Sequence, residues 1–164
     1  MIIDPANLAE KPDLSHAILL ASYVHKNQED KVGEPYVLHP IRAMLQMETE
    51  EEKIVAVLHD VIEDTEVTEE DLLRMGFSKN IVDAVCLLSI RIADGKKEPY
   101  RDFIERIKPN ELARNVKIAD IKDNLNQERL KTLSDNDFHR IDKYNRALAY
   151  LTDRNKDISI LDGF

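Results

Sequence analysis

The chain has 164 residues, enough for one ordinary domain, and its 43% hydrophobic and 34% charged residues are typical of a globular protein. Its 23 basic and 32 acidic residues give a formal net charge of −9. That charge repels phosphate backbones and anionic membranes, which argues against large nucleic acids and membrane surfaces as partners. A small anionic substrate remains compatible with it, because a metal ion and a few local cations can override the global field inside a cleft.

The sequence predicts a cytoplasmic location. Residues 1–13 carry neither the basic region nor the apolar run of a signal peptide, and the chain holds no apolar stretch of about 18 residues that would cross a membrane. The single cysteine, Cys86, lies in the apolar run IVDAVCLLSI, where we expect a small core residue rather than a nucleophile.

Apolar residues recur with helical spacing along most of the chain, which predicts an all-α protein. The first helices are expected at roughly residues 13–29, from Pro40 to about Met47, and from about Glu50 to Val61. A short helix should follow between an N-cap at Thr68 and a stop at Gly76, and the next should start after Ser78. The remaining helices are expected to contain Tyr100 to Ile107, to start at Asn110, and to span roughly residues 135–152.

The most informative segment is LHDVIEDT, which places ionisable side chains directly after a fully apolar helical run. Polar groups at such a place are costly to bury without a purpose. If the helix continues, His59 and Glu63 lie one turn apart, as do Asp60 and Asp64. Two of these side chains can then bind a cation while the other two face its water.

Two further segments supply metal-ligand types at similar places. His39 lies where a loop enters a helix, and Asp120 lies within the apolar stripe NVKIAD. Imidazole nitrogens combined with carboxylates suit Mn, Fe, Co, Ni or Zn better than Ca or Mg. These residue types together predict one divalent transition-metal ion.

Three segments, GEPYVLHP, LHDVIEDT and NVKIADIKDNL, resemble in order and spacing the hydrolase domain of RelA/SpoT-type enzymes. Those enzymes remove the 3′-pyrophosphate from the alarmone (p)ppGpp and belong to the HD superfamily. The resemblance spans roughly residues 14–151 and implies a single HD-type helical bundle, residues 1–164, around one metal-centred cleft. The ending, NLNQERL followed by a last helix, is similar to that of short stand-alone HD proteins.

Carried over residue by residue, the resemblance implies a role for eight positions. The implied metal ligands are His39, His59, Asp60 and Asp120, and the metal is expected to be manganese. The resemblance further implies that Glu63 and Asp64 handle the attacking water. It implies substrate contacts for Lys31, which lies where the family has a phosphate-contacting lysine, and for Asn124, which lies where the family contacts the nucleotide sugar.

The chain departs from the family pattern at Asp30. Family members usually have an Arg-Lys pair ahead of the Gly-Glu-Pro-Tyr segment, with the Arg packed against guanine, whereas this chain has Asp30-Lys31. A carboxylate neither stacks as a guanidinium does nor favours an anionic nucleotide. We therefore expect slow hydrolysis of ppGpp or none.

The expected function is hydrolysis of a phosphate or pyrophosphate ester of a nucleotide-like small molecule, with (p)ppGpp as one candidate. Two alternatives stay open, which are a non-catalytic module that senses a nucleotide or docks onto a partner, and a nucleoside 5′-monophosphatase. Further phosphate contacts are conceivable at Arg42, Arg91 and Lys117, although each is more often a solvated surface charge. The remaining histidines, His16, His25 and His139, are given no role.

Overall fold

The computed structural model describes residues 11–126 and 134–164. Residues 1–10, which make up most of the segment judged to lack a signal peptide, and most of NLNQERL lie outside the described residues. The chain forms α1 (Leu14–Val24), α2 (Leu38–Met44), α3 (Glu50–Leu58), α4 (Val61–Asp64), α5 (Glu69–Arg74) and α6 (Lys79–Leu88). A hairpin of β1 (Ile92–Ala93) and β2 (Lys96–Lys97) precedes α7 (Tyr100–Ile107), α8 (Glu111–Asn124), α9 (Asp135–Leu151) and the 3₁₀ turn η3 (Ile158–Leu161).

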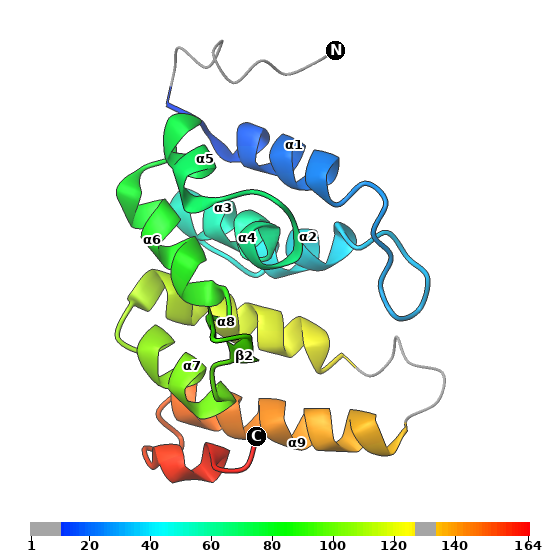
Figure 1. The fold of residues 1–164 in the computed structure, drawn as a ribbon, viewed down its shortest axis with the longest axis vertical. Coiled ribbons are helices and arrows are strands. Elements are labelled where there is room, and N and C mark those ends of the chain that lie inside the picture. The colour runs from blue at the N-terminus through cyan, green and yellow to red at the C-terminus, as the bar shows by residue number, and fades with distance from the viewer. Residues whose placement is uncertain (1–10, 127–133) are drawn as a thin grey trace.

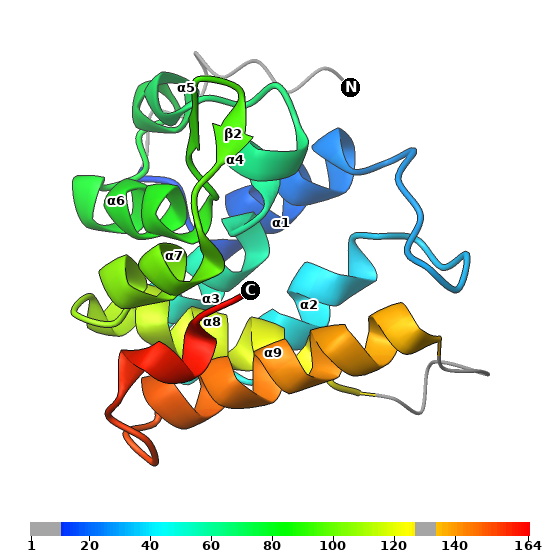
Figure 2. The same ribbon diagram turned by 60° about the horizontal axis from the view of Figure 1, so that its bottom comes forward.

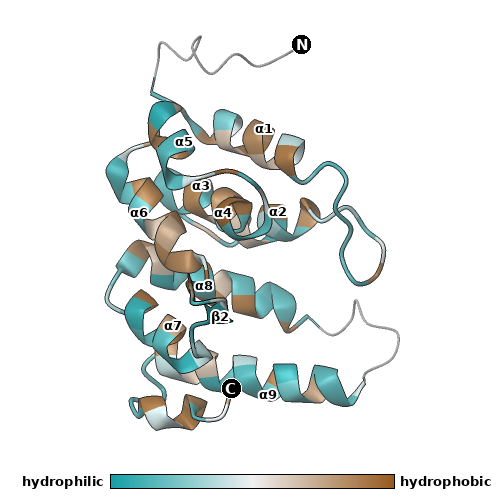
Figure 3. Cartoon of the chain, in the orientation of Figure 1, coloured by the Kyte–Doolittle hydropathy of each residue, from teal (hydrophilic) through white to brown (hydrophobic). Residues whose placement is uncertain are grey.

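The prediction of an all-α fold is confirmed, with the short hairpin as the one sheet in the described part of the chain. Helix α3 lies at the centre, where it packs against α1, α2, α6 and α8, while α9 packs against α8 and η3 (Figures 1 and 2). In Figure 3 the apolar α3 and α6 contrast with the mostly polar face that α9 presents to the viewer. No helix among the described residues is both long and apolar enough to cross a membrane.

Capping side chains explain where several helices begin. Thr49, Thr68 and Ser134 each accept from the third backbone N–H of their helix, and the acidic side chain at that third position accepts from the N-cap N–H in return. Helix α8 begins where predicted, with Asn110 as its N-cap. Gly76 ends the α5 segment with a φ of +91°, a conformation in which glycine has no steric penalty.

Two predicted helices are wrong in their extent. Helix α1 ends at Val24 rather than near residue 29, because the chain turns at His25 and enters a loop closed by a β-bridge between Glu29 and Pro35. The helix predicted from Glu50 to Val61 ends at Leu58, and α4 is a separate short helix. The ring of His59 binds the carbonyl oxygen of Ala56 at 2.7 Å, the group that would accept from residue 60 in a continuous helix.

Candidate metal centre and active site

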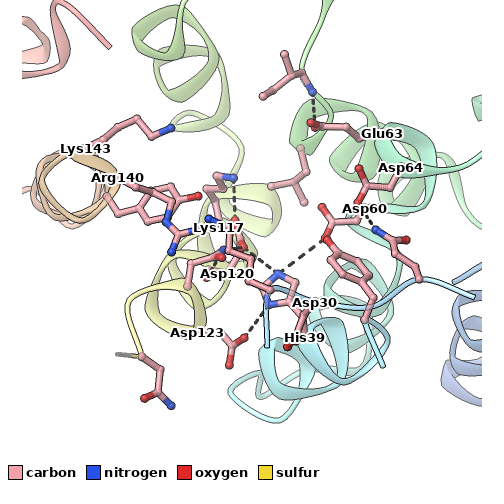
Figure 4. A pocket seen from close by; sticks show the side chains of 18 of the residues that line it. Asp30, His39, Asp60, Glu63, Asp64, Lys117, Asp120, Asp123, Arg140 and Lys143 are labelled. Atoms are coloured by element: carbon pink, nitrogen blue, oxygen red, sulfur yellow. Dashed lines mark hydrogen bonds and ion pairs between the residues drawn. The ribbon is translucent and has the colours of Figure 1, made fainter. Parts of the chain in front are cut away.

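A pocket of about 400 Å³ opens among the 25–36 loop and helices α2, α4, α8 and α9 (Figure 4). Its two sides differ in charge. Acidic side chains from the motifs line one side, and cations from α8 and α9 line the other. The acidic side holds Asp60, Glu63 and Asp64, and the other side holds Lys117, Arg140 and Lys143, with Asp120 paired to Lys117 on α8.

His59 is held so that one ring nitrogen faces the pocket's acidic cluster. Its Nδ1 lies 2.7 Å from the Ala56 carbonyl oxygen, which can only accept a hydrogen bond, so Nδ1 carries a proton. Nε2 is buried with no aligned hydrogen-bond partner, although Asp60 Oδ2 lies 3.0 Å from it. A neutral ring in this tautomer presents its Nε2 lone pair to the cluster, which is the form that binds a metal.

His39 is fixed in the same sense by a carboxylate. Its Nδ1 donates to Asp123 Oδ2 at 2.7 Å, and Arg42 grips the same carboxylate from behind through Nε at 2.7 Å and Nη2 at 3.0 Å. The His39 Nε2 atom then lies 3.1 Å from Asp120 Oδ1 and 3.8 Å from Asp60 Oδ2. A carboxylate behind a histidine in this way orients the ring and raises its basicity as a ligand.

Three of the four predicted ligands form a compact cluster. His39, His59 and Asp120 are all buried, and each offers one donor atom within 4.8 Å of the other two. Asp60 lies beside this cluster, with Oδ2 near both histidine Nε2 atoms and accepting from the Tyr36 hydroxyl at 2.5 Å. The structure therefore brings together all four residues that the sequence suggested.

The charged groups of the cluster shift one another's pKa. Burial alone would lower the pKa of His39, but hydrogen bonds to Asp120 and Asp123 raise it to about 10. Burial would raise the pKa of Asp120, yet the charge of Lys117 and the histidine contacts hold it well below its usual range. The pKa of Asp60 falls to about 2 against the effect of burial, chiefly through the charge of His59.

This donor set fits a divalent transition metal. The buried Nε2 of His59 has no aligned hydrogen-bond partner, and the carboxylates beside it attract positive charge. In the protein without a metal, the raised pKa of His39 and of His59 means that protons on the two rings supply that charge. Imidazole and carboxylate ligands together suit Mn, Fe, Co, Ni or Zn. A cation bound here would replace those protons, because histidine binds metal as the neutral ring.

Glu63 and Asp64 lie at the edge of the pocket on α4, and both are exposed. Glu63 Oε2 accepts from the backbone N–H of Ile90 at 2.9 Å, and Asp64 Oδ2 accepts from the Gln28 side-chain amide at 3.3 Å. Because the helix breaks at His59, the two carboxylates do not follow the histidine on one continuous helix as predicted. Both still line the same pocket as the histidine cluster (Figure 4).

The predicted substrate contacts both line the pocket but differ in their surroundings. Lys31 is two-thirds exposed, and its Nζ lies 3.8 Å from Asp137. Asn124 donates its amide to Asp120 Oδ1 at 2.5 Å, so in this arrangement it supports a predicted ligand. Arg42 is paired with Asp123 and is not among the residues that line the pocket. Lys117 faces the pocket while paired with Asp120 at 2.7 Å.

Helix α9 supplies cations that the sequence analysis did not single out. Lys143 is half-buried, with its Nζ 4.5 Å from the centre of the Tyr100 ring, and Arg140 lies one turn earlier on the same helix. Burial lowers the pKa of Lys143, and the neighbouring charges of Lys117 and Arg140 lower it further. Cations crowded beside a pocket in this way attract an anionic ligand.

The structure also adds three uncharged or acidic residues to the site, which are Asp123, Tyr36 and Gln28. Asp123 was visible as a polar residue three positions after Asp120 on one face of a predicted helix, which is a signal for a partner in the same site. Tyr36 belongs to the Gly-Glu-Pro-Tyr segment but was given no role, and Gln28 carried no signal, because the contacts of both depend on the path of the 25–36 loop.

Comparisons with known proteins support the resemblance. A guanosine-3′,5′-bis(diphosphate) 3′-pyrophosphohydrolase of Vibrio cholerae is 36% identical over 97 residues, which cover 55% of this chain and 14% of that protein. The bifunctional (p)ppGpp synthase/hydrolase SpoT of Escherichia coli is 32% identical over 102 residues, 57% of this chain and 14% of SpoT. The chain thus spans about one seventh of the length of these relatives, and no protein-family model matches it.

A solved structure provides the fold comparison. It is that of a metazoan ortholog of SpoT, described as hydrolysing ppGpp, and it aligns with a TM-score of 0.71 at 21% sequence identity. The alignment covers 93% of this chain and 94% of the ortholog. The chain is therefore related in sequence to the (p)ppGpp 3′-pyrophosphohydrolases and has the helical fold of the metazoan SpoT ortholog.

Proposed function

We propose that the chain is a metal-dependent phosphohydrolase that cleaves a phosphate or pyrophosphate ester of a nucleotide-like small molecule, with (p)ppGpp as the first candidate. The observation that carries the proposal is the orientation of the two histidines. The Nδ1 atoms of His39 and His59 are held by Asp123 and by the Ala56 carbonyl, so both Nε2 atoms face the carboxylates of Asp60 and Asp120. The relatives named as a 3′-pyrophosphohydrolase and as a (p)ppGpp synthase/hydrolase support the choice of reaction.

The proposed ligands are His39, His59, Asp60 and Asp120, holding one divalent cation, with manganese as the preferred candidate. When bound, such a cation lowers the pKa of water and neutralises charge on a phosphoryl oxygen. The protein's part is to keep both rings in the binding tautomer and to hold the carboxylates close to them. The Asp123 and Arg42 pair behind His39 serves that purpose.

Glu63 and Asp64 are proposed to orient and deprotonate the attacking water. Each side chain has one oxygen tethered by an N–H donor, from Ile90 or from Gln28, and a second oxygen available to contact water. Two other roles stay open for Asp64, which are proton donor to the leaving oxygen and support for a ligand histidine.

The cations across the pocket account for an anionic substrate despite the net charge of −9. Lys117, Arg140 and Lys143 line the side opposite Glu63 and Asp64, and Lys31 lies on the adjoining loop. We propose that phosphate groups of the substrate contact these cations and that Asn124 lies near its sugar. We further propose that the chain works as one HD-type unit in the cytoplasm.

The test is a substrate screen of the purified protein with added Mn²⁺. Alarmones, nucleoside mono-, di- and triphosphates and simple phosphate esters would be compared by release of phosphate and pyrophosphate. Pyrophosphate release from a 3′-pyrophosphorylated nucleotide supports the proposal, and preference for 5′-monophosphates favours the monophosphatase alternative. Binding of nucleotides without turnover of any of them would contradict the proposal and favour a non-catalytic sensing module.

A further inference from the structure

We infer that His25 and Gln28 form a positioning chain that holds Asp64 in place; the inference rests on the proposed function for its catalytic meaning. His25 Nδ1 lies 2.8 Å from Gln28 Oε1, and Gln28 Nε2 donates to Asp64 Oδ2 at 3.3 Å. The contact between Gln28 and Asp64 joins residues 36 positions apart, so it ties the loop after α1 to helix α4.

The direction of each hydrogen bond in the series His25–Gln28–Asp64 follows from the carboxylate at its Asp64 end. A carboxylate oxygen can only accept, so the Gln28 amide must direct its NH₂ group toward Asp64 and its carbonyl oxygen toward His25. That carbonyl also only accepts, so His25 Nδ1 must carry the proton. The hydrogen bonds from His25 through Gln28 to Asp64 therefore have one consistent direction, in which His25 Nδ1 is a donor.

The burial of His25 agrees with this assignment. Only 2% of the residue is exposed, and its Nε2 is buried without a hydrogen-bond partner in the described structure. A neutral Nδ1–H ring leaves only a lone pair at that position, whereas a charged ring would leave an N–H group without a partner. The ring also contacts that of Tyr36, with centroids 5.1 Å apart, so it has a fixed place from which to hold Gln28.

Asp64 needs such a tether because of where it lies. It is the last residue of the four-residue helix α4 and is exposed. The same loop also holds Asp60, through the Tyr36 hydroxyl at 2.5 Å, so one segment supports both a proposed ligand and a proposed water-holding carboxylate. Loss of the tether should lower kcat with little change in KM, because a displacement of about 1 Å at a reacting group can cost about 100-fold in rate.

Two variants separate positioning from simple structural support. Gln28→Met keeps the side-chain volume and removes both hydrogen bonds. Gln28→Glu keeps an acceptor for His25 but has no N–H to give to Asp64. We expect both to lower kcat by about 10- to 100-fold, with KM for Gln28→Met within about threefold of the wild-type value, and the exposed neighbour variant Asn27→Ala to match wild type. Wild-type kcat in Gln28→Glu would show that only the support of His25 matters and would overturn the inference.

A second measurement does not depend on activity. In ¹⁵N NMR spectra of protein with labelled histidine, the signals absent from a His25→Phe variant identify His25. We expect a neutral ring protonated on Nδ1, and a change in those signals in Gln28→Met but not in Asn27→Ala. A ring protonated on Nε2 alone would overturn the inference even in an active enzyme, because it could not donate to Gln28. If the wild-type protein hydrolyses none of the substrates, the proposed function fails. The NMR result still decides whether the hydrogen bonds from His25 through Gln28 to Asp64 form.

Discussion

Replacing Asp123 by Ala tests how the histidine ligands are prepared. The substitution removes the acceptor from His39 Nδ1, 2.7 Å away, and leaves the Arg42 guanidinium without the carboxylate that it grips through two nitrogens. The Asp123 side chain is 4% exposed, so water does not readily replace it. Loss of a partner behind a metal-bound histidine typically costs about 10- to 100-fold in metal affinity, which corresponds to about 1.4–2.8 kcal/mol.

The same substitution should also destabilise the metal-free fold. Breaking a buried ion pair by removing one partner costs about 3–5 kcal/mol, and we expect the lower end because the Arg42 side chain is 29% exposed. Calorimetric titration with Mn²⁺ and urea unfolding measure the two effects separately. Asp123→Asn is the matched control, since its amide oxygen still accepts from His39 and should preserve more of the metal affinity. Equal Mn²⁺ affinity in wild type and Asp123→Ala would refute the role assigned to this contact.

Substitutions at three other positions give further tests. Glu63→Gln should retain metal and lose about 10²–10⁴-fold in turnover; unchanged turnover would remove Glu63 from the mechanism. Burial would raise the pKa of Glu98, but its contacts with Arg106 lower it, so this pair stabilises the fold above the ordinary glutamate pKa and the stabilisation is lost as the pH falls. Glu98→Gln should therefore have a lower free energy of unfolding in urea than wild type at pH 7, and the difference should close below about pH 4.5. A difference that does not change with pH would contradict this. The natural protein should hydrolyse ppGpp slowly and the Asp30→Arg variant faster, as measured by kcat/KM. Because Asp30 Oδ1 also accepts from two loop N–H groups, Asp30→Asn isolates the effect of charge. Fast wild-type turnover with no gain in either variant would show that Asp30 has no effect on ppGpp hydrolysis.

The sequence predicted most helices because their signals are local. Capping residues such as Thr68 and Asn110, the stop at Gly76 and the apolar spacing each act within a few residues, and the structure confirms them. The hairpin between β1 and β2 was missed although Asp94-Gly95, both at positive φ, is a typical turn signal for such a hairpin. The break after Leu58 could not be predicted from apolar spacing. It accompanies a side-chain hydrogen bond, in which the His59 ring takes the Ala56 carbonyl oxygen that a continuous helix would use.

The candidate site was predictable as far as residue type and motif order allow. His39, His59, Asp60 and Asp120 lie together as the resemblance implied. The partners that hold them were not assigned, because Asp123 reaches His39 across 84 residues and Gln28 reaches Asp64 across 36. Such contacts depend on the packing of whole helices and loops, which a single sequence does not specify.

The most direct test of the account is the stoichiometry of Mn²⁺ binding, measured by electron paramagnetic resonance during titration of the metal-free protein. We expect one tightly bound ion per wild-type chain and loss of that ion in a His59→Ala, Asp60→Ala double variant that remains folded by circular dichroism. The buried cluster of His39, His59 and Asp120 is the basis for this expectation. Undiminished binding in the double variant, or no tight binding by the wild-type chain, would contradict the assignment of this cluster as the metal centre.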